Sequence, residues 1–231
     1  MIVSVFGPCG IITATAAQDT FYEMQEYDEE VYAFPYSIKG LPHTFTFWKK
    51  FVLTYNSIIP NVYNDQMQTH FISLERKWDK APHIKDFMPY LKKLILDNHI
   101  QIIGVVSAYC EENGVQNVPF VYQILGEQIR RVNVDDKGNI NYNCICLEKD
   151  PIVGRLLRKV KLLNGDVWEE APECRFRYDL FSVSRSIDFC SFVIKTNHYI
   201  NNANTTEYGN SLLMDISVVT PDSTEITQNN I

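Results

Sequence analysis

The six cysteines have the most varied chemistry in this sequence, because a thiol can form a disulfide, bind a metal or act as a nucleophile. They are Cys9, Cys110, Cys144, Cys146, Cys174 and Cys190. A chain of 231 residues is large enough to fold without disulfide staples. Its opening residues also lack the basic and apolar regions of a signal peptide. We therefore expect reduced, mostly buried thiols.

Two of these cysteines, Cys144 and Cys146, are one residue short of the CxxC spacing that is typical of zinc ligands. The sequence has no second pair of Cys or His at ligand spacing, so we expect no metal site and no cofactor. Cys9, in the sequence Gly7-Pro8-Cys9-Gly10, is a candidate reactive thiol, although no histidine lies near it in the sequence.

The histidines and the glycines give no further catalytic motif. The five histidines are spread along the chain without an HxH or HxxxH pair, and we expect them to be capping or surface residues: His43, His70, His83, His99 and His198. No GxGxxG, GxxxxGK[ST] or GxSxG motif is present. Nucleotide binding and a nucleophile-elbow hydrolase are therefore unsupported.

The charge balance narrows the possible partners. The chain has 21 basic and 28 acidic residues, which gives a net charge of −7. A general electrostatic affinity for nucleic acid or for an anionic membrane is therefore not expected. No apolar run approaches the roughly 20 residues that a bilayer span requires, so we expect a cytoplasmic protein. A basic cluster (Arg155, Arg158, Lys159, Lys161) is either a solvated helix face or a contact for an acidic segment such as 23–30 of another subunit.

The hydrophobic pattern predicts the elements that must position these residues. A hairpin is predicted over 2–6 and 11–17, with Gly10 at a positive φ, and segment 23–30 is interpreted as a loop or a solvated edge. No element is assigned to 61–80. Further strands are predicted at 31–38, 100–108, 120–125, 129–134, 139–145 and 214–220. Helices are predicted at 44–59, 82–97, 150–160 and 178–197.

Runs of strands that alternate with pairs of helices favour an α+β fold, in which helices cover antiparallel sheets. No Pro-, Gly- or Ser-rich linker divides the chain. We therefore predict one domain over residues 1–226, followed by a frayed polar tail over 227–231.

The order of elements resembles the proteasome-subunit branch of the N-terminal-nucleophile (Ntn) hydrolases. The similarity is carried by the opening hairpin that ends at Asp19, the strand and turn over 105–111, the hairpin around 120–140, and the long helix over 182–194. The closing strand and turn over 208–222 also resemble that family. The resemblance implies a four-layer αββα sandwich, with two antiparallel sheets packed between helix pairs.

The resemblance also implies a site. In that family the first residue of the mature chain is a Thr, Ser or Cys whose own α-amine acts as the general base. Here the nearest hydroxyl is that of Ser4, while Asp19 and Lys39 would take the places of the supporting carboxylate and lysine. The residue before Ser4 is Val3, not the glycine at which the family is normally processed.

Two functional hypotheses follow from the resemblance. In the first, the chain is a proteasome-like subunit without its own peptidase site, which acts within an oligomer of itself or of related subunits. In the second, it is an amidohydrolase or peptidase that cleaves a peptide or amide substrate after processing at Ser4. A binding module on the same fold, without self-assembly, is a third possibility.

Overall fold

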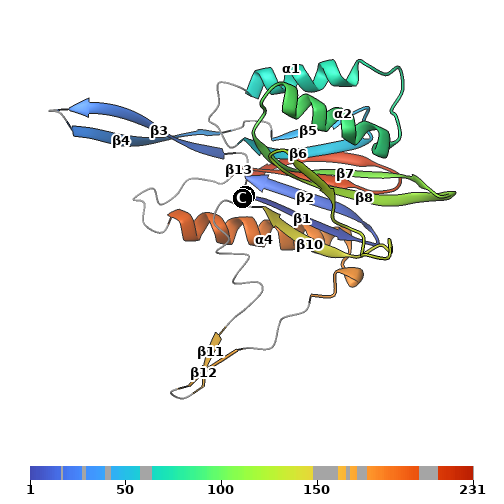
Figure 1. Ribbon diagram of the computed structural model, residues 1–231. Coiled ribbons are helices and arrows are strands. Elements are labelled where there is room, and N and C mark those ends of the chain that lie inside the picture. The colour runs from blue at the N-terminus through green and yellow to red at the C-terminus, as the bar shows by residue number, and fades with distance from the viewer. Residues whose placement is uncertain are drawn as a thin grey trace.

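A computed structural model describes residues 1–16, 18–27, 30–39, 43–57, 64–147, 161–164, 167–170, 176–202 and 213–230. Two five-stranded antiparallel sheets and three α-helices make up most of these residues (Figure 1). The expected α+β class is therefore confirmed. Among the described residues, no helix is both long enough and apolar enough to cross a membrane.

The first sheet, called here the β1 sheet, has the strand order β10-β1-β2-β13-β14. Its strands are β1 (Ile2–Gly7), β2 (Gly10–Ala16), β10 (Asn143–Leu147), β13 (Leu213–Val219) and β14 (Thr224–Asn230). The predicted opening hairpin is confirmed, with Gly7 opposite Gly10 across a two-residue turn. The segment from residue 227, expected to be a frayed tail, instead continues β14, which pairs with β13.

Gly10 does not adopt the positive φ that we expected. Its role is to allow a close approach, because a Cβ at this position would lie 3.1 Å from the Val219 carbonyl oxygen of the neighbouring strand. Gly7 is more tightly enclosed, since its Cβ would lie 2.9 Å from the Tyr178 carbonyl oxygen. The two glycines of this turn therefore serve packing.

The second sheet, called here the β7 sheet, follows chain order from β5 to β9. Its strands are β5 (Thr44–Phe47), β6 (Phe51–Ser57), β7 (Ile102–Glu112), β8 (Val115–Leu125) and β9 (Gln128–Arg131). The strands predicted at 100–108, 120–125 and 214–220 are confirmed, although β7 and β8 extend further than expected, to a tight turn at Asn113 and Gly114. Those predicted at 129–134 and 139–145 are confirmed in part, because β9 ends at Arg131 and β10 begins at Asn143.

The helix predicted over 44–59 is wrong, because this segment forms the hairpin β5–β6. Phe47, Phe51 and Tyr55 are spaced by four residues, and that spacing places them on one face of a helix or of a strand. The turn decides between the two. The Lys50 N–H donates to the Phe47 carbonyl, and both central residues have a positive φ, at 50° for Trp48 and 54° for Lys49. These are the φ signs of a type I′ hairpin turn.

The helices are α1 (Asn64–Glu75), α2 (Ile84–Asp97) and α4 (Val183–Asn202), with a short 3₁₀ helix η1 (Tyr178–Leu180) before α4. The predicted helices over 82–97 and 178–197 are confirmed, with shifted ends. The predicted helix over 150–160 lies outside the described residues.

Buried apolar side chains form three clusters. The first lies between the β7 sheet and helices α1 and α2, and contains Phe47, Phe71 and Phe87. The second lies between the β1 sheet and α4, and contains Val3, Ala14 and Cys190. The third draws residues from both sheets, including Phe6, Val105 and Val219. The central strands of each sheet therefore contribute buried side chains to two clusters.

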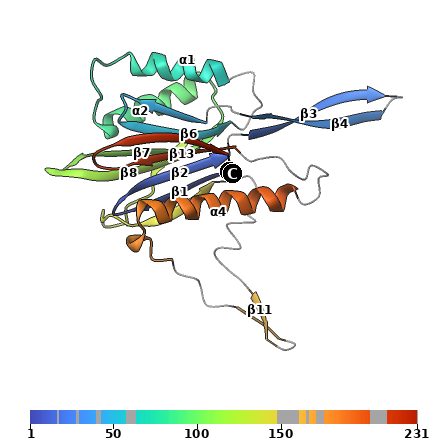
Figure 2. The same ribbon diagram turned by 180° about the vertical axis from the view of Figure 1, so that it is seen from behind.

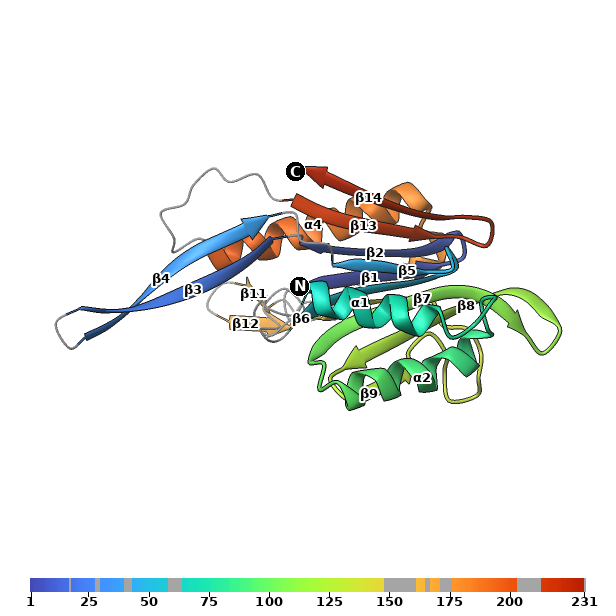
Figure 3. The ribbon, with the colours of Figure 1, turned by 90° about the horizontal axis from the view of Figure 1, so that it is seen from above.

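Two further hairpins leave the body of the molecule (Figures 1 and 2). One, called here the arm, consists of β3 (Gln18–Tyr27) and β4 (Glu30–Lys39). Within the described residues its two strands pair only with each other, and Figure 3 shows them extending well beyond the sheets. Segment 23–30, interpreted as a loop or an edge, thus belongs mostly to strands. The other hairpin is β11 (Lys161–Asn164) with β12 (Val167–Glu170).

Candidate functional site

Ser4 lies in the middle of β1, opposite Thr13 on one side and Ile145 on the other. Its side chain is fully buried, and its Oγ is 2.9 Å from the Oγ1 of Thr13. The preceding residues Ile2 and Val3 are fully buried as well. In this position the Ser4 hydroxyl is enclosed in the strand and hydrogen-bonded to another hydroxyl.

Asp19 and Lys39 lie at the base of the arm, where Asp19 pairs with Ile38 and Lys39 pairs with Gln18. Their side chains are outside the described atoms. The hydroxyl partner described for Ser4 is Thr13, a residue without a motif in the sequence.

A row of buried hydroxyl and amide side chains lies where the two sheets meet. Its members from the β1 sheet are Ser4, Thr13, Thr15 and Ser217, and from the β7 sheet Thr54, Ser107 and Gln123. Hydrogen bonds cross between the sheets. The Asn56 side-chain amide lies 3.1 Å from Thr15 Oγ1, to which its nitrogen donates, and Thr54 Oγ1 lies 3.5 Å from Ser217 Oγ. These contacts fix the register of one sheet on the other, because a buried polar group must find a partner.

At one end of this row, His43 and Asp215 are both buried. The His43 backbone N–H donates to Asp215 Oδ2 at 3.2 Å, and His43 Nδ1 lies 3.1 Å from the Tyr55 carbonyl oxygen. Burial raises the pKa of the Tyr55 hydroxyl to about 12. The expectation that His43 is a surface or capping residue is wrong. An acidic residue inside the apolar strand Leu213–Val219 was the sequence signal that could have indicated this group.

The remaining histidine predictions have mixed outcomes. His83 is the N-cap of α2, where its Nδ1 accepts from the Lys85 N–H at 3.1 Å, so a capping role is confirmed. His99 is exposed and has a φ of 51°. His70 and His198 are half-buried.

The five described cysteines are free thiols, of which two are buried. Cys110 and Cys190 are buried, and Cys9 is exposed. The hydrogen bond with Cys146, together with burial, raises the pKa of Cys144, and burial raises that of Cys190. Raised thiol pKa values disfavour the nucleophilic thiolate. Among the residues that the structure describes, no three His, Cys, Asp or Glu side chains are arranged to hold a metal ion.

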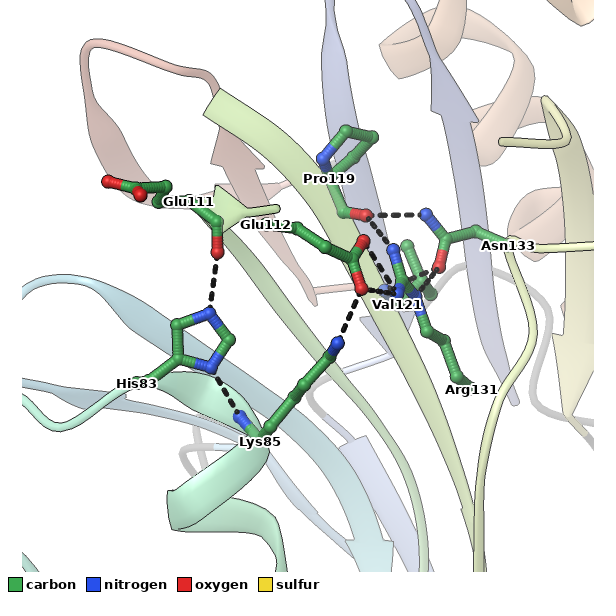
Figure 4. Close-up of polar contacts among 8 residues, drawn as sticks. All are labelled: His83, Lys85, Glu111, Glu112, Pro119, Val121, Arg131 and Asn133. Carbon is green, nitrogen blue, oxygen red and sulfur yellow. Dashed lines mark hydrogen bonds and ion pairs between the residues drawn. The ribbon is translucent and has the colours of Figure 1, made fainter. Parts of the chain in front are cut away.

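A charged cluster lies where the start of α2 approaches the end of β7, the middle of β8 and the end of β9 (Figure 4). Arg131 Nη1 donates to both carboxylate oxygens of Glu112 at 3.0 Å, and Lys85 Nζ lies 2.6 Å from Glu112 Oε1. Burial raises the pKa of Glu112, but the hydrogen bonds from Lys85 and Arg131 outweigh burial and lower it. The buried Asn133 donates to the Pro119 carbonyl and accepts from the Val121 N–H.

The row between the sheets holds Ser4, one of the two predicted nucleophiles, whereas the other, Cys9, is exposed on the β1–β2 turn. The charges of the cluster around Arg131 pair with one another. The hydroxyl of Thr13, which is bonded to Ser4, stabilises the pairing of the strands but is not a general base. Comparison with known proteins adds no assignment: no protein-family model and no curated protein matches the chain.

Proposed function

We propose that the chain is a proteasome-like subunit with a four-layer αββα fold, and that it acts within an oligomer without a peptidase site of its own. The layers would be α1 with α2, the β7 sheet, the β1 sheet and α4. The three buried clusters support this order, because each has the composition expected between one pair of neighbouring layers.

The burial of Ser4 in the middle of β1 is the observation that supports the proposed absence of a peptidase site. An Ntn nucleophile must be the first residue of the mature chain, so Met1, Ile2 and Val3 would have to be removed. Ile2 pairs with Leu147 and Thr15, and Val3 pairs with Cys146 and Ala14. Both side chains are fully buried, in two different clusters. Removal of these residues would cost about 1.5–3 kcal/mol of unfolding free energy for each buried side chain.

The intact mass of the protein, produced without an amino-terminal tag, tests this part of the proposal. We expect Ile2 and Val3 to be retained. A chain that begins at Ser4 would overturn the proposal in favour of an amidohydrolase or peptidase, and Asp19→Asn should then abolish its activity while leaving the melting temperature nearly unchanged. In the proposed subunit, Asp19→Asn is expected to be silent.

Light scattering at several protein concentrations tests the assembly. We expect a mass well above the 26.8 kDa of one chain. A monomer at the highest concentration would contradict the oligomer and favour a binding module on the same fold.

A further inference from the structure

The turn between β5 and β6 is held in a backbone conformation that its residues rarely adopt. Trp48 and Lys49 both have a positive φ, which is uncommon for residues other than glycine and costs about 1 kcal/mol or more for each. The Trp48 backbone N–H donates to Glu75 Oε1, and the Trp48 ring contacts the Trp78 ring edge-on at 5.8 Å. These contacts attach the turn to the end of α1.

Five exposed basic side chains flank this pair of tryptophans. They are Lys49, Lys50, Arg76, Lys77 and Lys80, called here the collar. The acidic residues within the same two segments are Glu75 and Asp79, so the net charge is 5 − 2 = +3 on a chain of net charge −7. The half-exposed Tyr90 ring lies edge-on to Trp78 at 4.8 Å, which adds an aromatic surface beside the charges.

The arm has the opposite charge. Residues 18–39 include six acidic residues and one lysine, a net charge of 1 − 6 = −5, together with six aromatic residues. Its two strands of ten residues reach about 34 Å. A two-stranded hairpin is at best marginally stable in water without a surface to pack on. The composition and isolation of the arm therefore indicate that it has a protein partner.

The collar cannot be the partner of the arm within one molecule. The loop that joins α1 to α2 lies at one end of the molecule, and the arm leaves the other end in all three views (Figures 1 to 3). We propose that the arm of one copy docks on the collar of a second copy. This inference rests on the proposed function as an oligomeric subunit and names the two surfaces that join its members. The contact is heterologous, so it generates a ring or an open chain of copies.

A charge swap tests the contact in the full-length chain. Two triple variants each give the arm and the collar charges of the same sign. The collar variant is Lys49→Glu/Lys50→Glu/Lys77→Glu. The arm variant is Glu23→Lys/Glu26→Lys/Glu30→Lys. We expect each to weaken self-association about tenfold or more, and more strongly at low salt. The control Lys92→Glu/Lys93→Glu makes a similar change on exposed residues of α2 outside the collar and should associate like the wild type.

Mixing the two variants gives the sharpest readout, because both contacts between unlike copies again join opposite charges: the reversed arm meets the reversed collar, and the unchanged arm meets the unchanged collar. We expect mixed complexes with equal numbers of the two variants in analytical ultracentrifugation, with each variant folded as judged by its melting temperature. If the wild type assembles and neither variant changes its association, the arm–collar contact is wrong while the oligomeric function survives. If the variants weaken association but the mixture does not form mixed complexes, the pairing of these two surfaces is wrong. A wild type that stays monomeric contradicts both proposals.

Discussion

Arg131 holds Glu112 through hydrogen bonds from a single nitrogen, Nη1, to both carboxylate oxygens, each at 3.0 Å. The same guanidinium lies 3.8 Å from the centre of the Phe120 ring and donates to the Pro119 carbonyl at 3.1 Å. One side chain at the end of β9 therefore joins the end of β7 to the middle of β8. Only 14% of its surface is exposed, so these interactions are partly shielded from water.

Arg131→Met should lower the free energy of unfolding by about 2–4 kcal/mol, because Glu112 loses its two hydrogen bonds from Arg131 and the Pro119 carbonyl loses one of its two donors. Urea titration at pH 7 measures the change. Arg130→Met is the matched control. Arg130 is exposed and donates to Gln123 at 2.9 Å, so its replacement should cost less than about 1 kcal/mol. Equal losses in the two variants would show that the Glu112 contact adds nothing.

Glu112 should also make stability depend on acidity. Its pKa in the folded protein is below the ordinary value of 4.5, so the unfolded chain binds this proton first as the pH falls. The stabilisation is fully present above about pH 4.5 and is lost as the pH falls through the lowered value. Urea titrations between pH 7 and pH 3 should show that Glu112→Gln loses less unfolding free energy at low pH than the wild type does. Parallel pH profiles would contradict this assignment.

The hydrophobic pattern predicted the secondary structure best where its spacing fits a helix but not a strand. This is true of Ile84, Phe87, Leu91 and Ile95, and all four residues are buried in α2. Phe47, Phe51 and Tyr55 are spaced by four residues, which fits the period of a helix and that of a strand. The deciding feature was the turn at Trp48 and Lys49, which have a positive φ. Residues other than glycine, asparagine and aspartate are uncommon in such a turn, so the sequence did not indicate it. Helix α1 could have been predicted from Met67, Phe71 and Leu74, whose spacing is helical.

The candidate site could be predicted only in part, because contacts between sheets depend on tertiary packing. Thr13 and Thr54 are ordinary strand residues in the sequence, and nothing local indicates that they meet Ser4 and Ser217. His43 follows a proline in the chain, a position typical of surface turns, yet it is buried beside Asp215. The pairing of distant strands creates these neighbours, and a single sequence does not encode that pairing locally.

Two buried tyrosines should respond differently to removal of their hydroxyls at pH 7. The Tyr109 hydroxyl is buried and has no hydrogen-bond partner among the residues that the structure describes, so Tyr109→Phe should be neutral or stabilising. The Tyr55 hydroxyl is hydrogen-bonded to Gln68, so Tyr55→Phe should cost about 1 kcal/mol. Urea titration compares the two variants. A clear loss of stability in Tyr109→Phe would contradict the environment described for its hydroxyl.

The same tyrosines predict a loss of stability in alkali. Burial raises both pKa values from 10.0 to about 12, so the unfolded chain ionises first as the pH rises. Their stabilisation is fully present below pH 10 and should fall by about 1.4 kcal/mol per pH unit for each tyrosine between pH 10 and 12. Urea titrations across this range should show a shallower decline in Tyr109→Phe. An unchanged decline would exclude Tyr109 as a source of the effect.

The hydrogen bond between Ser4 and Thr13 separates a structural from a catalytic role for Ser4. Both hydroxyls are buried, so Ser4→Ala leaves the Thr13 hydroxyl without this partner and should cost about 1–2 kcal/mol of unfolding free energy. Thr13→Val should cost a similar amount. The double variant replaces both hydroxyls by apolar groups of similar shape, so its loss should be smaller than the sum of the two single losses. Urea titration of the four proteins gives this coupling directly. Additive losses would show that the two hydroxyls do not support each other, and loss of a peptidase activity in Ser4→Ala alone would assign Ser4 to catalysis.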